Sequence, residues 1–471
     1  MRRRALLLSF AVLVACREPV PGAAPRPEMR AGRPYDVVLV TIDTLRADHL
    51  GAYGYARPTS PHIDALAERG TLFERCSTYW PKTRASFVMM LTGRTPSRNG
   101  FSKTHPQLLD FNPTLAQTLK DAGYETAAAV DNPNVAANLG YARGFDEYVE
   151  TWEDPSLATE MDRTRAITAF GLEQLGRERE RPLFLWLHYV NPHTPYQPPA
   201  PFDTAFLEEA SPEPELELVR GMHGGIPERL AVEGRRRLSY YVAQYDGEIA
   251  AVDREVGEIA RAVERGKGFD RTLVLLTSDH GESLGEHDYY FDHGADLFEP
   301  SLAVPLIVAL PGGPKGNRSR SIASTLDVLP TVLDAVKVSF PPELSGTSLL
   351  PAVEGRGPVE RERLFAQNDL HHRATWTRHR KLVVEQVDEE RERHLLFDLG
   401  RDPGELENVR RERPGEYHGE LAALEEHMAA AAEEWVAMRA RLAAGASHPE
   451  PPVSPEACRQ LLELGYVESC D

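Results

Sequence analysis

Four short, almost continuously apolar runs set the strongest limit on how this chain can fold. Strands buried on both faces of a sheet carry such runs, whereas strands with one solvated face alternate apolar and polar residues. Segments with a helical repeat lie between the runs, and this alternation predicts an α/β sandwich around a parallel or mixed sheet. The runs are YDVVLVTID (35–43), GYETAAAVDN (123–132), RPLFLWLHYVN (181–191) and RTLVLLTSDHG (271–281).

Polar residues that can bind metals or carry protons follow three of these runs. In open α/β sheets the carboxyl ends of neighbouring strands form the ligand-binding edge, so residues far apart in the sequence meet there. We therefore expect a functional site at this edge. The residues concerned are Asp43, then His188, Asn191 and His193, and then Asp279 and His280.

The stretch TSDHGESLGEHDYYFDHG at 277–294 is rich in acidic and histidine residues. Asp279 and His280 offer one carboxylate and one imidazole, a mixture that suits Zn, Mn or Mg better than a calcium cage made of oxygens alone. A solvated acidic loop is the alternative. Asp43 likewise follows a buried strand, where a carboxylate is costly unless a cation or hydrogen-bond donors meet it. Its alternative role is to cap the next helix.

The segment PKTRASFVMMLTGR at 81–94 predicts a helix with Thr83 at its N-cap. A hydroxyl at this position lies next to free backbone N–H groups, which form a site for an oxyanion. Thr83 is therefore either a cap alone, worth about 1 kcal/mol, or a nucleophile. The second role needs a metal to lower the pKa of the hydroxyl, because a free threonine is a poor nucleophile.

The loop HYVNPHTPYQPP at 188–199 places two histidines among prolines. Prolines restrict the backbone, so His188 and His193 are held in place. A histidine fixed in this way can protonate a leaving group or contact a bound anion. The alternative is that both are inert loop residues.

The charge of the chain excludes one broad class of partners. With 53 basic and 72 acidic residues the formal net charge is -19, which repels nucleic acid. We expect no nucleic-acid partner. An anionic substrate must be captured by a local positive site, such as a metal ion or a helix N-terminus.

The first sixteen residues, MRRRALLLSFAVLVAC, are typical of an export signal. Their apolar run is too short to span a bilayer. LVAC resembles the lipobox of bacterial lipoproteins, which implies cleavage before Cys16 and lipidation of its thiol; ordinary secretion is the alternative. Residues 17–34 then form a Pro-rich tether. We expect an exported protein, periplasmic or on the cell surface, anchored to a membrane through Cys16.

The rest of the chain predicts a main domain at 35–360 and a C-terminal part at 361–471. The C-terminal part has short strand patterns, which predict a smaller antiparallel sheet, and an Ala-, Glu- and Arg-rich stretch at 415–445, which predicts a long surface helix. Cys458 and Cys470 are close enough in sequence for a disulfide in an exported chain. Nothing in the sequence indicates the oligomeric state.

Taken together, several segments resemble the sulfatase family of the alkaline-phosphatase superfamily. The resemblance implies a large mixed sheet between helices, a smaller C-terminal sheet, and hydrolysis of sulfate or phosphate esters at a divalent metal ion (Ca, Mn, Zn or Mg). It further implies that Asp43, Asp279 and His280 bind the metal, and that His193 and His293 contact the substrate or its leaving group. The segments are DVVLVTIDTLRADHLGAYGY, PKTRASFVMMLTGRTPSRNG, HYVNPHTPYQPP, TSDHGESLGEHDYYFDHG, FEPSLAVPLIVALPG and LFDLGRDPGELENV.

The chain departs from the family pattern at the nucleophile. The family signature begins with a Cys or Ser that is converted to formylglycine, and this position is Thr83, which cannot be converted. The Pro and Arg of the signature are replaced by Ala85 and Phe87. Three further family positions also differ, where a second aspartate, a lysine and a histidine are replaced by Thr44, Asp131 and Pro133.

These departures leave three functional hypotheses. The first is a metal-dependent hydrolase with Thr83 as nucleophile, acting on a small-molecule, glycan or lipid ester. The loss of the Arg and Lys contacts favours a phosphodiester or phosphonate monoester over a dianionic phosphate monoester. The second is a transferase that passes the group from Thr83 to an alcohol. The third is a sulfatase-like binding lipoprotein that has lost catalysis.

Overall fold

The computed structural model describes residues 35–208, 213–444, 451–467 and 469–470. The predicted signal peptide, Cys16 and the tether of residues 17–34 lie outside these parts. No helix in the described parts is both long enough and apolar enough to cross a lipid bilayer.

A nine-stranded mixed sheet forms the centre of the molecule. The four predicted strands are four neighbours in it, in the order β8-β1-β5-β3, and they pair in parallel. The predicted fold class is therefore confirmed. The strands of this sheet are β1 (Asp36–Ile42), β2 (Thr71–Ser77), β3 (Glu125–Val130), β4 (Glu147–Glu150), β5 (Leu183–Tyr189), β8 (Thr272–Thr277), β11 (Ala303–Val304), β12 (Leu306–Ala309) and β13 (Asn317–Ser324).

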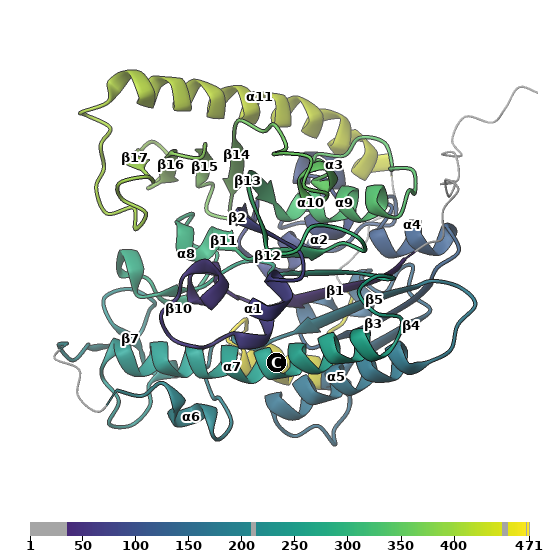
Figure 1. Cartoon of the computed structure of the whole chain (residues 1–471). Coiled ribbons are helices and arrows are strands. Elements are labelled where there is room, and N and C mark those ends of the chain that lie inside the picture. The colour runs from purple at the N-terminus through teal and green to yellow at the C-terminus, as the bar shows by residue number, and fades with distance from the viewer. Residues whose placement is uncertain (1–34, 209–212, 445–450, 468, 471) are drawn as a thin grey trace, which may run out of the picture.

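Both faces of this sheet are covered by helices (Figure 1). Along β1, Val37 and Leu39 belong to the hydrophobic core on one face, and Val38 and Val40 belong to the core on the other. Successive side chains of a strand point to opposite faces, so a strand between two helical layers must be apolar throughout. This requirement explains the continuous apolar runs.

The helices fall into two layers and a C-terminal group. Helices α5 and α7 lie on one face of the sheet, and α2, α4 and α9 on the other (Figure 1). The helices are α1 (Pro61–Ala67), α2 (Thr83–Thr92), α3 (Pro96–Asn99), α4 (Leu115–Asp121), α5 (Glu160–Gly176), α6 (Phe202–Ala205), α7 (Leu238–Arg265), α8 (Glu299–Leu302), α9 (Val328–Ala335), α10 (Leu350–Val353), α11 (Pro414–Ala444) and α12 (Pro455–Glu463).

Several strands of the central sheet were not predicted, among them β2 and β13. β2 reads TLFERCS and β13 reads NRSRSIAS, and the two pair in parallel. Neither has a continuous apolar run, because both lie near one end of the sheet, where part of each strand is exposed.

A small antiparallel sheet follows the main sheet, as predicted. Its strands are β14 (Leu364–Gln367), β15 (Arg373–Trp376), β16 (Arg380–Gln386) and β17 (Glu392–Asp398). The long helix α11 packs along it, with Leu424 against Leu382 and Leu396 (Figure 1). Two short two-stranded sheets complete the fold: β6 (Leu218–Val219) with β7 (Ile226–Pro227), and β9 (Ser283–Leu284) with β10 (Tyr290–Asp292).

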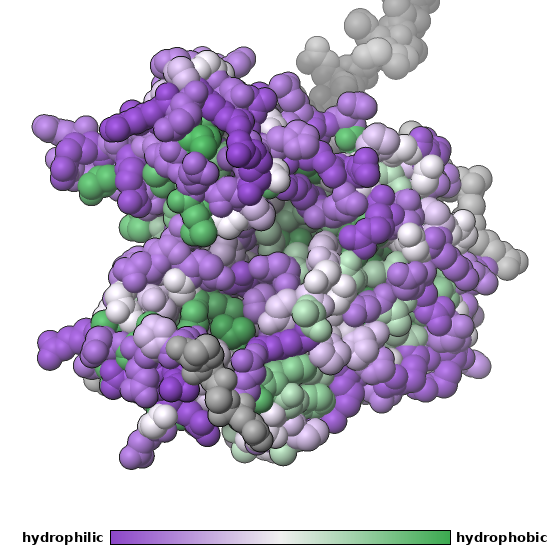
Figure 2. Space-filling view, turned by 60° about the vertical axis from the view of Figure 1, so that its left-hand side comes forward, coloured by the Kyte–Doolittle hydropathy of each residue, from purple (hydrophilic) through white to green (hydrophobic). Residues whose placement is uncertain are grey.

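The surface in Figure 2 is mostly hydrophilic, with hydrophobic residues in separate patches. This agrees with the high proportion of charged residues, 27% of the chain.

A buried lysine joins the small sheet to the main domain. Lys381 on β16 is 0% exposed, and its Nζ lies 2.8 Å from Glu405 Oε1 and 3.0 Å from Glu299 Oε1. These two carboxylates raise the pKa of Lys381 against the lowering effect of burial. The ammonium group therefore stays charged and couples α8 to the small sheet.

Replacing Lys381 by methionine should lower the free energy of unfolding by about 3–5 kcal/mol, because it leaves Glu405 buried without its cation. The matched control is Arg391→Met, which removes an ion pair with Asp388 in which the arginine side chain is 74% exposed; exposed pairs of this kind contribute little to stability. Urea unfolding of the full chain measures both values. A loss for Lys381→Met no larger than the control would contradict the proposed coupling.

Candidate active site

Three residues meet at the carboxyl ends of β1 and β8. Asp43 follows β1, and Asp279 and His280 follow β8, its direct neighbour in the sheet. All three side chains are 0% exposed. One ligand atom from each lies within 4.8 Å of the others. The residues predicted to bind the metal are therefore close enough together to share one ion.

The carboxylates of this group are incompletely satisfied by the protein. Asp43 Oδ1 and Asp279 Oδ2 have no hydrogen-bond partner among the described residues. Burial, and then the charge of Asp279, raise the pKa of Asp43 well above its ordinary value. Two buried carboxylates and one imidazole without matching donors fit a divalent cation such as Zn, Mn or Mg.

Neighbouring groups fix the orientation of these side chains. Asn132 donates a hydrogen bond from Nδ2 to Asp43 Oδ2 at 2.7 Å. His280 Nδ1 lies 3.0 Å from the carbonyl oxygen of Gly281, which can only accept, so Nδ1 carries the proton and Nε2 presents a lone pair to the site. Such outer contacts set the tautomer and direction of metal ligands.

Thr83 is the first residue of α2 and not its N-cap, which is Lys82. Its hydroxyl makes no capping contact, and instead Oγ1 lies 3.2 Å from His280 Nε2 and 3.0 Å from the hydroxyl of Tyr466. Thr83 is 1% exposed. The expected N-cap role is therefore wrong, and the hydroxyl points at the Asp43, Asp279 and His280 group.

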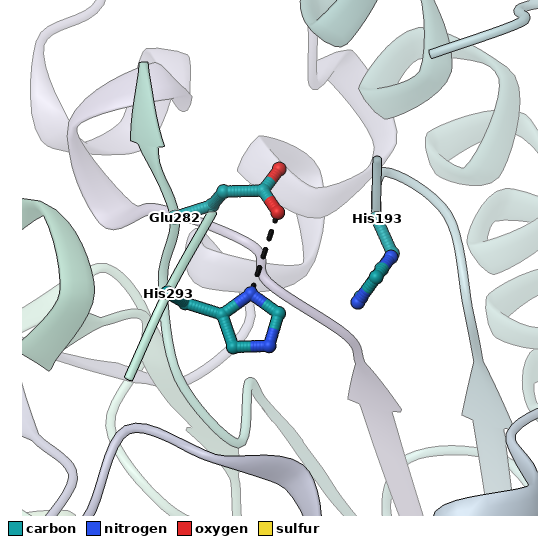
Figure 3. Close-up of side chains that lie close together, drawn as sticks. All are labelled: His193, Glu282 and His293. Carbon is teal, nitrogen blue, oxygen red and sulfur yellow. Dashed lines mark hydrogen bonds and ion pairs between the residues drawn. The ribbon is translucent and has the colours of Figure 1, made fainter. Parts of the chain in front are cut away.

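His193, Glu282 and His293 form a second buried group (Figure 3). It lies beside the first group. His293 Nδ1 is 3.4 Å from Glu282 Oε1, and the rings of His280 and His293 are 4.2 Å apart between centroids. His193 Nδ1 lies 2.6 Å from the carbonyl oxygen of Thr194, so it carries the proton and Nε2 is an acceptor. These three residues could hold a second cation.

Burial dominates the ionisation of this second group. It lowers the pKa of His193 to about 4 and that of His293 well below its ordinary value, so both imidazoles are neutral at pH 7. Burial also raises the pKa of Glu282 to about 8, although Tyr196 donates a hydrogen bond to it. Neutral imidazoles with an inward lone pair are ready to bind a metal.

A family model described as Sulfatase matches residues 35–338, and a model described as N-sulphoglucosamine sulphohydrolase, C-terminal, matches residues 285–434. The chain belongs to the sulfatase family. The membership predicted from the sequence is therefore confirmed, and with it the class of the protein: it is a sulfatase-like hydrolase of a family that depends on divalent metal ions.

Named relatives support this assignment. The chain is 25% identical over 439 residues to an arylsulfatase of Clostridium perfringens, covering 79% of this chain and 90% of that one. It is 26% identical over 453 residues to a choline-sulfatase of Rhizobium meliloti, covering 81% of this chain and 83% of that one.

Two solved structures share the fold. One is BT4656 in complex with its substrate D-glucosamine-2-N,6-O-disulfate, with a TM-score of 0.72, 20% identity, and coverage of 85% of this chain and 99% of the other. The other is the phosphonate monoester hydrolase of Agrobacterium radiobacter, with a TM-score of 0.69, 22% identity, and coverage of 90% and 99%.

The positions that depart from the sulfatase pattern have structural roles of their own. Phe87 packs its ring against Trp186 and His188 at centroid distances of 5.2 and 4.7 Å. Asp131 pairs with Arg163 Nε at 2.9 Å and accepts a hydrogen bond from Gln460 at 2.9 Å. Neither position brings positive charge to the site.

Several other candidates lie around the site without entering it. His188 Nδ1 lies 3.1 Å from Thr41 Oγ1, and its Nε2 lies 3.7 Å from Asp43 Oδ2. His188 therefore packs against the first group and helps to position Asp43. Asn191 accepts a hydrogen bond from Thr164 at 2.5 Å. His287 stacks on Phe298, at a centroid distance of 3.7 Å. Only part of the acidic 277–294 loop therefore faces the site.

Three residues of the site were not predicted from the sequence. Glu282 is one of several acidic residues in its loop, and no pattern distinguishes it from the others. Asn132 follows β3, so its position at the end of a predicted strand could have identified it. Tyr466 lies far along the chain, in a C-terminal segment whose position no local pattern predicts.

Proposed function

We propose that this chain hydrolyses sulfuric or phosphoric-type esters, with Thr83 as the nucleophile and a divalent cation held by Asp43, Asp279 and His280. The observation that carries the proposal is the position of Thr83 Oγ1, 3.2 Å from the lone-pair nitrogen of His280 and fully enclosed in the site. A buried threonine hydroxyl beside two carboxylates and a neutral imidazole has the surroundings of an activated nucleophile.

A bound divalent cation lowers the pKa of a nearby hydroxyl and screens the negative charge of the ester group. Thr83 Oγ1 loses its proton to water and attacks the central phosphorus or sulfur atom, the bond to the leaving oxygen breaks, and the leaving oxygen takes a proton from water. Water then hydrolyses the ester on Thr83 and restores the free hydroxyl. Asp43 and Asp279 bring no positive charge to the site, so an anionic ester needs the cation as its counter-charge.

The surroundings of Thr83 favour a singly charged group. Phe87 and Asp131 stand where the family pattern has Arg and Lys, and the structure gives them apolar and ion-pair roles. Thr83 also cannot become formylglycine, whose hydrate releases sulfate by a route that a threonine ester lacks. We therefore favour a phosphodiester or phosphonate monoester, in a small molecule, glycan or lipid, over a sulfate ester.

The second group supports a second cation. An imidazole nitrogen that only accepts, as His193 Nε2 does here, does not bind an anionic oxygen well, but it is a good metal ligand. Two-metal sites typically have ions about 3.5–4 Å apart, and the rings of His280 and His293, one from each group, lie 4.2 Å apart between centroids. We propose that His193, Glu282 and His293 bind this ion.

We also propose that the chain is exported and lipid-anchored through Cys16. Cys458 and Cys470 form a disulfide in the structure, and structural disulfides persist in oxidising compartments. Cys76 is buried and unpaired.

Turnover should depend on Thr83. Protein loaded in turn with Mn, Zn, Mg and Ca should be assayed against aryl sulfate, phosphate monoester, phosphodiester and phosphonate monoester. We expect turnover of at least one class, a fall in kcat of about 10³-fold or more for Thr83→Ala, and partial activity for Thr83→Ser, which keeps the hydroxyl. Product analysis with added alcohols separates a hydrolase from a transferase.

Equal rates for Thr83→Ala and the unchanged chain would refute the nucleophile. Cation binding with no turnover of any ester would favour the binding lipoprotein instead.

Metal content should distinguish one bound cation from two. Protein is equilibrated with Mn or Zn, freed of excess metal, and analysed by inductively coupled plasma mass spectrometry. We expect two equivalents of bound metal per chain. Glu282→Gln should lower this value to about one, because it removes one of the three ligands of the second group. His287→Gln, outside both groups, should leave it at two. One equivalent in the unchanged chain would return His193 and His293 to the role of substrate contacts.

A further inference from the structure

Tyr466 reaches the candidate active site from the C-terminal end of the chain. It follows α12 and lies within the loop closed by the Cys458–Cys470 disulfide. Its hydroxyl oxygen is 3.0 Å from Thr83 Oγ1 and 2.9 Å from His193 Nε2. Its ring lies 5.2 Å from that of His193 between centroids. A residue far along the chain therefore touches both groups of the site.

The Tyr466 oxygen occupies space that a substrate needs. Reacting atoms stand about 3–3.5 Å from the attacking atom before a bond forms, and the Tyr466 oxygen is at that distance from Thr83. While no cation is bound to His193, its Nε2 is an acceptor, the Tyr466 hydroxyl donates to it, and the oxygen stands in front of Thr83. A cation on the second group would take this lone pair and leave Tyr466 its contact with Thr83. A tetrahedral ester group cannot bind between Thr83 and His193 while this hydroxyl is there.

Burial leads to the same conclusion. Thr83 and His193 are each 1% exposed, and His280 is 0% exposed. A substrate therefore reaches Thr83 only if part of the enclosing structure moves. Tyr466 itself is partly exposed and contacts both Thr83 and His193 from the outside.

The segment that carries Tyr466 is held by buried residues of α12, Ala457 and Leu461, and by side-chain hydrogen bonds. Gln460 on α12 donates from Nε2 to Asp131 Oδ1 at 2.9 Å, and Ser454 donates to Glu153 at 2.5 Å. A hollow of about 390 Å³ lies between α12 and the loops after β3 and β4, lined in part by Trp152 and Leu461. The disulfide ties Cys470 back to α12, so Tyr466 and the helix are linked as one unit.

We propose that Tyr466 is an active-site residue that the substrate must displace, so that the disulfide-closed C-terminal segment controls access to Thr83 and raises KM. This inference rests on the proposed function, since it assigns the substrate to the space in front of Thr83. It makes Tyr466 a competitor of the substrate and not a proton donor in the reaction.

Tyr466→Ala and Tyr466→Phe in the full, metal-loaded chain test this proposal. We expect Tyr466→Ala to lower KM by about tenfold without lowering kcat, and Tyr466→Phe, which keeps the ring but loses both hydrogen bonds, to lower KM by a smaller factor. Leu462→Ala is the matched control, because this residue on α12 is 45% exposed and outside the site; its KM should equal that of the unchanged chain. Thermal midpoints confirm that each variant is folded.

Calorimetric titration with inorganic phosphate keeps the test independent of turnover. Tyr466→Ala should bind phosphate about tenfold more tightly than the unchanged chain, even if no ester in the panel is hydrolysed. The Cys458→Ser/Cys470→Ser double variant should shift phosphate affinity in the same direction, because it frees the end of the segment.

Two outcomes would overturn the proposal. One is an equal phosphate affinity and an equal KM for Tyr466→Ala and the unchanged chain. The other is a fall in kcat for Tyr466→Phe with unchanged phosphate affinity, which would make Tyr466 a catalytic residue. Neither result requires that the proposed function has failed, because the turnover of the unchanged chain is measured separately.

Discussion

The close approach of two buried carboxylates, Asp43 and Asp279, is the constraint on which the site depends. Each follows a strand that is buried along its whole length, both are 0% exposed, and each keeps one oxygen without a hydrogen bond among the described residues. Burying such charges costs several kcal/mol unless a cation compensates them. The sheet therefore places a group that fits a divalent ion beside Thr83, the nucleophile that we propose.

The parts of the site that belong to the sheet could be predicted from sequence. The apolar runs place Asp43, Asp279 and His280 at neighbouring strand ends, because parallel strands bring their carboxyl ends to one edge. The cap assigned to Thr83 was wrong by one position, since helix ends are poorly specified by sequence. β2 and β13 were missed because partly exposed strands lack a continuous apolar run. Tyr466 could not be predicted, because a contact across 383 residues of chain leaves no local periodicity.

The departures from the sulfatase pattern form a consistent set. The residue that is converted to formylglycine is replaced by Thr83. Phe87 packs against the ring of Trp186, and Asp131 forms an ion pair with Arg163. We propose that the neutral His193 and His293, with Glu282, supply the ligands of a second cation. The fold is that of a sulfatase, while the chemistry we propose relies on metal activation of an unmodified hydroxyl.

The most direct test of this account is a search for a covalent ester on Thr83. Metal-loaded protein is mixed with a slowly hydrolysed phosphonate monoester, quenched in acid, digested, and analysed by mass spectrometry of the peptide that contains Thr83. The account predicts that this peptide gains the mass of the transferred group during turnover, and that Thr83→Ala does not. Turnover with an unmodified Thr83 peptide, or with the group on another residue, would contradict it.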